Sequence, residues 1–115
     1  MREDGKIDYV EFPGASLAAT KAFYRDAFGW TFTDYGPDYA AFEAGVDGGF
    51  DASAKDQTPL PLVVLYARDL EAMAARVQAA GAVILRPIYT FPGGRRFHFR
   101  DPSGNELAVW SDVLP

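Results

Sequence analysis

The chain has 115 residues, of which 49% are apolar, and its 16 acidic against 11 basic residues give a net charge of −5. This length is typical of one domain, which can bury roughly two-thirds of the surface that its unfolded form exposes. The acidic balance argues against nucleic acid as a partner, because phosphates are repelled. Cysteine is absent, which excludes disulfides and thiol nucleophiles. No run of about 18 apolar residues predicts a membrane span, and the polar start is unlike a signal peptide, so we expect a cytoplasmic protein.

The first half of the sequence predicts a strand, a helix and three more strands. Lys6 to Phe12 alternates and is rich in β-forming residues, and Pro13-Gly14 ends this strand. Ser16 is placed to cap a helix that runs to about Phe28 and ends at Gly29. Helical spacing predicts an apolar side made of Leu17, Thr20, Phe23, Tyr24 and Ala27. Further strands are predicted at residues 30–35, 39–44 and 48–50, and the glycines of the last one indicate a bulge or a close backbone approach.

The second half repeats this order after a polar, proline-flanked linker at about residues 53–61. Asp69 is placed to cap a helix from Leu70 to Ala80, which Gly81 ends. The predicted strands of this half are residues 62–67, 82–85, 95–100 and 106–110, with a tight turn at Asp101 to Asn105 before the last. The repeat predicts a single α+β domain made of two βαβββ modules, about residues 6–52 and 62–111, with the helices outside.

Three motifs carry a resemblance to a known family. They are AFYRDAFGW at residues 22–30, ARDLEA at residues 67–72 and FRDPSGNEL at residues 99–107. In this order and at this separation, the sequence from Lys6 to Ser111 resembles the vicinal oxygen chelate superfamily, which includes glyoxalases, bleomycin-resistance proteins and extradiol dioxygenases. The resemblance implies a mixed sheet that curves around a cavity. It also implies a homodimer.

The resemblance also shows where metal ligands would lie. Metal enzymes of this family hold a divalent ion with His, Glu or Gln on the first strand of each half and the last strand of the second. The matching positions here are Tyr9, Leu62 and Ala108. Two of these side chains have no lone pair, and a phenol with a pKa near 10 is a weak ligand. We therefore expect no metal and no cofactor, which argues against lactoylglutathione lyase, dioxygenase and fosfomycin-transferase activity.

Strand alternation predicts which side chains face the cavity. His98 joins them because the matching position faces the cavity in relatives, and Glu11 and His98 are the two candidates for a catalytic role. Each also has a structural interpretation, Glu11 as an exposed acid paired with an arginine and His98 as a hydrogen-bonded core residue. Arg95 and Arg96 are expected on a solvated hairpin face. The predicted ligand-binding residues are Tyr9, Glu11, Leu62, Val64, Tyr66, His98, Ala108 and Trp110, and the opposite faces, which pack on the helices, hold Val10, Phe12, Val63, Leu65, Leu107 and Val109.

These residues predict an aromatic pocket with one carboxylate and one imidazole, which is typical of a small-molecule site. The leading hypothesis is a protein that binds a small, partly aromatic or cationic molecule in a metal-free cavity, as bleomycin-resistance proteins do. The alternative is a metal-independent lyase or isomerase in which His98 or Glu11 is the general base. A third hypothesis is an accessory domain without a ligand.

Overall fold

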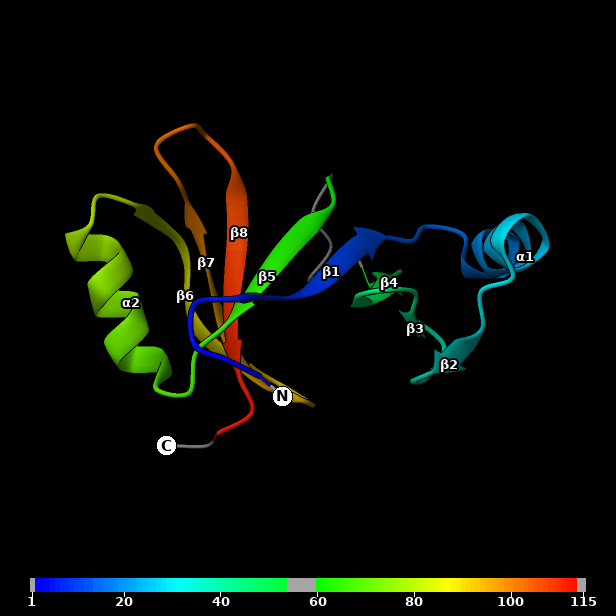
Figure 1. Ribbon diagram of the computed structural model, residues 1–115, viewed down its shortest axis with the longest axis horizontal. Coiled ribbons are helices and arrows are strands. Elements are labelled where there is room, and N and C mark those ends of the chain that lie inside the picture. Colours follow the sequence, from blue (N-terminus) through cyan, green and yellow to red (C-terminus); the bar gives the residue numbers. More distant parts are fainter. Residues whose placement is uncertain (1, 54–59, 114–115) are drawn as a thin grey trace. The chain divides into compact units, whose positions relative to one another are not determined.

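The computed structural model describes residues 2–53 and 60–113, and this part of the chain contains two βαβββ modules (Figure 1). The α+β class and the repeat are therefore confirmed. Most of the predicted linker lies outside the described residues. No helix in the described part is long and apolar enough to cross a membrane. The elements are β1 (Ile7–Pro13), α1 (Leu17–Phe28), β2 (Phe32–Asp34), β3 (Tyr39–Glu43), β4 (Asp47–Asp51), β5 (Leu62–Tyr66), α2 (Leu70–Ala79), β6 (Val83–Phe91), β7 (Gly94–Arg100) and β8 (Glu106–Ser111).

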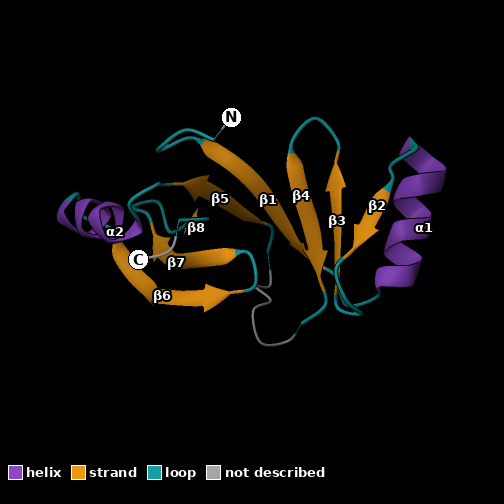
Figure 2. Cartoon of the chain, turned by 90° about the horizontal axis from the view of Figure 1, so that it is seen from below, coloured by secondary structure: helices purple, strands orange, loops and turns teal. Residues whose placement is uncertain are grey.

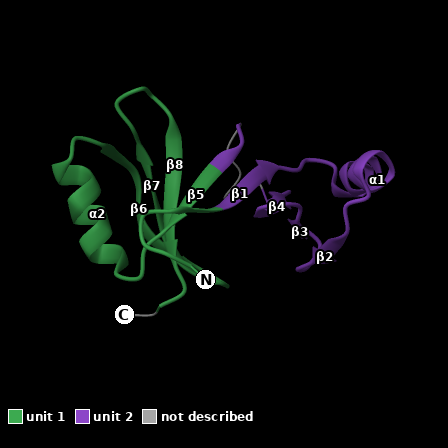
Figure 3. Cartoon of the chain, viewed as in Figure 1, with its two compact units in different colours: residues 1–8, 63–115 green, residues 9–62 purple. Residues whose placement is uncertain are grey.

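The chain divides into two compact units (Figure 3). Unit 1 comprises residues 1–8 and 63–115, and unit 2 comprises residues 9–62. The strand order is β5-β8-β7-β6 in unit 1 and β2-β3-β4-β1 in unit 2 (Figure 2). In each unit the first strand of the module pairs in parallel with the last one, and the remaining pairs are antiparallel. Both modules therefore have the same topology.

In unit 1, α2 packs on one face of the sheet. Asp69 caps this helix, since its carboxylate accepts a hydrogen bond from Ala72 N at 3.0 Å. Leu70 is fully buried against a core that includes Phe97 and Val109. The predicted helix-facing residues Leu65, Leu107 and Val109 all contribute to this core, so alternation assigned their face correctly.

In unit 2 the core is aromatic, and α1 is only partly packed on it. Phe12 stacks on Phe50 with centroids 5.2 Å apart, and Trp30 lies 4.7 Å from Phe42. No residue of α1 is buried. Phe23 is 57% exposed and Ala27 is exposed as well, so part of the predicted apolar side remains in contact with solvent. Bulky rings on the sheet hold the helix away from the strands.

The N-terminus of α1 also departs from the sequence prediction. Ser16 occupies the N-cap position, but its side chain makes no capping hydrogen bond. The predicted C-terminus of α1 is confirmed, because Gly29 ends the helix in the left-handed conformation with φ of 75°.

The strand expected at residues 82–85 is much longer. It continues through Pro87 to Phe91 as β6, the last strand in the order of unit 1. Proline is tolerated there because an edge strand does not need every N–H for pairing. Arg86 pairs with His98 and Tyr89 pairs with Arg96, so three steps along β6 match two along β7. This bulge places Arg86 and Tyr89 on the same face of the sheet.

The glycine pair in β4 allows aromatic rings from β3 to cross it. A Cβ atom added at Gly49 would lie 2.6 Å from Tyr39 Cζ, and one added at Gly48 would lie 2.8 Å from Phe42 Cε1. Real Cβ atoms do not approach so closely, which confirms the predicted close approach at these positions. The ring of Tyr39 can therefore reach across β4 toward β1.

A methyl group at Gly49 should destabilise the protein. We expect Gly49→Ala to lower the free energy of unfolding by about 1–3 kcal/mol, because the Tyr39 ring must move. Urea unfolding of Gly49→Ala, Tyr39→Ala and the double variant measures the coupling between the two positions. The double variant should lose less stability than the sum of the single losses. Strictly additive losses would contradict the proposed steric contact.

Candidate functional site

The residues predicted to line the cavity belong to both units. Tyr9, Glu11 and Leu62 fall in unit 2, and the others fall in unit 1. A single cavity formed by all of them stays a prediction. Each unit contains its own polar cluster, and the two clusters are described separately.

In unit 1 the predicted residues share the sheet face that points away from α2. The register places Val64 beside Ala108 and Ala108 beside His98, so these three side chains form one row across β5, β8 and β7. The next row is Tyr66, Trp110 and Arg96. We call this surface the open face because it points away from α2. Its five predicted residues lie together on it; Trp110 is half-buried, and the other four, Val64, Tyr66, His98 and Ala108, are buried.

His98 is the polar centre of the open face. Its side chain is 0% exposed. Nδ1 lies 2.8 Å from Glu106 Oε2, and Nε2 lies 3.0 Å from the Tyr89 hydroxyl oxygen. Because a carboxylate only accepts hydrogen bonds, Nδ1 carries the proton, and Nε2 accepts from the Tyr89 hydroxyl.

Burial lowers the pKa of His98, because the charged imidazolium loses its hydration. The Glu106 carboxylate opposes this effect, whereas the positive charges of Arg96 and Arg86 add to it. The imidazole is therefore neutral at pH 7. Both ring nitrogens are already hydrogen-bonded, so His98 reaches a ligand only through one of its partners.

Tyr89 is the partner that sequence analysis missed. Its hydroxyl oxygen accepts a hydrogen bond from Arg96 Nε and another from Arg86 Nη1 at 3.3 Å. The Arg86 guanidinium also lies 4.1 Å from the centroid of the Tyr89 ring. Simple alternation cannot place Arg86 and Tyr89 on one face, because they are three residues apart. Pro87 within an apolar strand pattern was the available signal for a bulge.

One end of the open face is aromatic. Trp110 packs edge-on against Tyr66 with centroids 5.6 Å apart, and Phe91 of β6 has its ring centroid 6.3 Å from that of Trp110. Trp110 Nε1 donates to Asp8 Oδ2 at 2.9 Å, and the Tyr66 hydroxyl donates to an oxygen of Asp112 at 2.5 Å. The polar ends of both rings are thus bonded within unit 1, which fixes the rings in place.

The prediction that Arg95 and Arg96 lie on a solvated hairpin face is wrong. Both residues are buried, with 8% and 7% of their surface exposed. Arg95 points to the helix side, where its guanidinium forms a bidentate ion pair with the carboxylate of Glu71 of α2. Arg96 lies on the open face beside Tyr89. β7 lies between β6 and β8, so neither of its edges is open to solvent.

In unit 2, Tyr9, Tyr39 and Glu11 form a second polar cluster. The two hydroxyl oxygens lie 2.5 Å apart, and the Tyr39 hydroxyl donates to Glu11 Oε2 at 3.1 Å. Glu11 is only 8% exposed, so the structural interpretation as an exposed acid does not hold. Burial raises the pKa of Tyr9 to about 12 and also raises the pKa of Tyr39.

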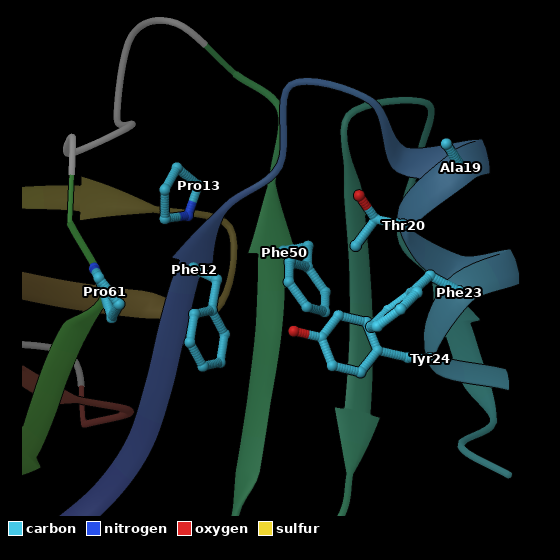
Figure 4. Close-up of a pocket in the computed structure, with 8 residues that line it drawn as sticks. All are labelled: Phe12, Pro13, Ala19, Thr20, Phe23, Tyr24, Phe50 and Pro61. Atoms are coloured by element: carbon cyan, nitrogen blue, oxygen red, sulfur yellow. The ribbon is translucent and has the colours of Figure 1, made fainter. Parts of the chain in front are cut away.

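Unit 2 also contains a cavity of about 430 Å³ between α1 and the strands (Figure 4). Phe12 and Phe50 form one wall, and Thr20, Phe23 and Tyr24 of the helix form the other. Its surroundings are almost entirely apolar, and it contains none of the predicted site residues.

The residues at the family's metal positions do not fit a divalent ion. Leu62 and Ala108 are buried hydrocarbon side chains, and the Tyr9 hydroxyl is engaged with Tyr39. Within residues 2–53 and 60–113, no group of three or more His, Cys, Asp or Glu side chains could hold a metal ion. This donor set offers no step that runs through a metal.

Comparison with known proteins identifies related sequences. Residues 6–109 match the family model of the Glyoxalase/Bleomycin resistance protein/Dioxygenase superfamily. The chain is 34% identical over 92% of its length to the anthracycline biosynthesis protein DauV of Streptomyces sp. (strain C5), and 31% identical to DnrV of Streptomyces peucetius. It spans about half the length of these relatives, since it covers 46% of each.

Solved structures have the same fold. The Mn(II)-bound glyoxalase from Novosphingobium aromaticivorans is 26% identical, with a TM-score of 0.67 over 99% of this chain and 41% of that one. Methylmalonyl-CoA epimerase from Mycobacterium tuberculosis is 13% identical, with a TM-score of 0.73 over 99% of this chain and 92% of that one. The second likeness concerns the fold alone.

The buried phenols of unit 2 predict how stability depends on pH. The unfolded chain releases phenol protons near pH 10, whereas folded Tyr9 keeps its proton until about pH 12. The stability that these phenols contribute should therefore be fully present below pH 10, and the free energy of unfolding should fall as the pH rises from 10 toward 12. Urea unfolding at a series of pH values measures this loss.

The double variant Tyr9→Phe, Tyr39→Phe should lose less stability over this pH range than the wild-type protein. Tyr35→Phe is the matched control, because Tyr35 is 66% exposed, and it should behave like the wild type. The same pH dependence in the double variant would rule out these two phenols as the cause.

Proposed function

The chain belongs to the glyoxalase/bleomycin resistance protein/dioxygenase superfamily, and on that premise we propose that it binds a planar aromatic molecule on the open face without a metal. The observation that carries this proposal is the aromatic end of the face. Trp110, flanked by Tyr66 and Phe91, offers rings on which a planar ligand can stack.

Two further observations support an aromatic ligand. The hydrogen bonds to Asp8 and Asp112 hold the Trp110 and Tyr66 rings in place. Binding of a ligand would therefore cost little side-chain conformational entropy at these two residues. The relatives DauV and DnrV are named for anthracycline biosynthesis, and anthracyclines contain a fused planar ring system.

The alternative function, a metal-independent lyase or isomerase, is favoured by one specific observation. The hydrogen-bonded chain of Tyr89, His98 and Glu106 connects an acid, a base and a carboxylate on the face proposed to bind the ligand. Glu11, the other candidate base, accepts a hydrogen bond from Tyr39 in a separate cluster.

Tryptophan fluorescence tests the binding proposal directly, because the chain has only two tryptophans, one in each unit. We expect anthraquinone-2-sulfonate to quench Trp110 saturably in Trp30→Phe, which retains Trp110 alone. In Trp110→Leu, affinity measured by calorimetry should fall by about 1 kcal/mol, roughly fivefold, because ring stacking is lost. Trp30→Phe should bind as the wild type does, since Trp30 lies in the core of unit 2. Equal affinity in Trp110→Leu would refute binding at this face.

We also propose that the protein contains no stoichiometric divalent metal, because the donor set at Tyr9, Leu62 and Ala108 is unsuitable. Elemental analysis of protein purified without a chelator should find well under one ion per chain. One tightly held zinc, nickel, manganese or iron ion per chain would contradict this proposal.

A homodimer is the remaining proposal, and it rests on the family resemblance. Light scattering at micromolar concentration should give about twice the chain mass of 12.6 kDa. A value of one chain mass under these conditions would refute a stable dimer.

A further inference from the structure

We propose that Tyr89 is an acid–base residue of the open face and that His98 and Glu106 form a proton relay from it to solvent. This inference deepens the proposed function, because it assigns proton-transfer chemistry to the face that would bind the ligand. The substrate class is an aromatic compound with a C–H bond next to a carbonyl group.

The relay rests on a gradient of exposure along three hydrogen-bonded side chains. Tyr89 on β6 is half-buried, His98 on β7 is completely buried, and the side chain of Glu106 on β8 is 35% exposed. The Tyr89 hydroxyl is joined to His98 Nε2 at 3.0 Å, and Nδ1 is joined to Glu106 Oε2 at 2.8 Å. A proton can thus pass between the interior of the face and a carboxylate in contact with water.

The charges around Tyr89 favour its ionised form. Arg86 lies on the same strand, Arg96 lies on β7, and both donate hydrogen bonds to the phenol oxygen. A phenolate there would face two guanidinium groups, which stabilise negative charge on the oxygen. The negative charge of Glu106 lies beyond His98, where it stabilises an imidazolium instead. The same arginines that disfavour a charged His98 at rest therefore favour proton loss from Tyr89.

The proposed step balances within these three residues and the substrate. The O–H bond of Tyr89 breaks as an N–H bond forms at His98 Nε2, and the electron pair stays on the phenol oxygen. The phenolate then takes the proton from the substrate carbon, and the C–H electron pair becomes the enolate. Tyr89 then delivers the proton to another carbon of the enolate, which completes an isomerisation, and His98 returns its Nε2 proton to the phenolate, so that all three residues recover their starting protonation states.

The bulge in β6 makes this arrangement possible. In a regular strand Arg86 and Tyr89, which are three residues apart, would lie on opposite faces of the sheet, and the register shift between them brings both to one face. Ile88, within the bulge, packs toward the α2 core, whereas Tyr89 turns to His98. The irregularity therefore serves the polar cluster, in keeping with the frequent occurrence of bulges at functional sites.

Ionisation of Tyr89 in the ligand-free protein is the decisive test, and it does not depend on the binding proposal. Carbon-13 labelling of the tyrosine ring Cζ atoms gives one NMR signal per tyrosine, and Tyr89→Phe identifies the Tyr89 signal. We expect this signal to titrate below the ordinary phenol value near pH 10. In Arg86→Met it should titrate at higher pH than in the wild type, because one stabilising charge is removed. Titration of Tyr89 at or above pH 10 in the wild type would overturn the proposal.

Solvent exchange tests the chemistry. In D₂O, wild-type protein that binds 2-tetralone should accelerate deuterium incorporation next to its carbonyl group, and Tyr89→Phe should lose this acceleration by about 10²-fold or more. Glu106→Gln should slow exchange while leaving 2-tetralone affinity unchanged, because Glu106 acts through His98. Tyr35→Phe is the matched control and should exchange as the wild type does. Full exchange activity in Tyr89→Phe would refute the acid–base role. Titration of Tyr89 below pH 10 in a protein that binds no aromatic ligand would refute only the binding proposal.

Discussion

The open face of unit 1 depends on one constraint, the complete burial of the His98 imidazole. A buried polar ring is costly unless both nitrogens have hydrogen-bond partners. Glu106 supplies an acceptor for Nδ1 from the neighbouring strand β8, and Tyr89 supplies a donor for Nε2 from the other neighbour, β6. Three adjacent strands are thus joined by side chains across the same face on which their backbones already pair.

The bulge in β6 is the backbone feature that meets this constraint. It brings Arg86 to the same face as Tyr89, although the two are three residues apart, while Ile88 packs in the hydrophobic core beneath α2. Tyr89 in turn holds Arg86 and Arg96 against its hydroxyl group. In unit 2, Gly49 has a comparable effect, since it allows the Tyr39 ring to cross β4 and reach Glu11. In each unit, one local departure from a regular strand therefore creates a polar cluster.

The sequence predicted the two βαβββ modules and the open-face residues of β5 and β8 because those strands alternate regularly. The same rule correctly assigned Leu65, Leu107 and Val109 to the helix side. It did not reach Tyr89, since the strand was expected to end before Pro87, and it could not place Arg86, because register shifts on both sides of that residue change the phase of alternation. Helical spacing likewise did not predict the exposure of Phe23, because it identifies an apolar side but not how closely that side packs. The contacts of Glu106 and Arg96 required coordinates.

The central claim is that His98 connects Tyr89 to Glu106 in one fixed orientation. The chain has a single histidine, so nitrogen-15 NMR of the imidazole reports on this residue without assignment. Our account predicts one neutral tautomer at pH 7, with the proton on Nδ1 and with Nε2 accepting a hydrogen bond that Tyr89→Phe removes. A proton on Nε2, or a rapidly exchanging mixture of both tautomers, would contradict it.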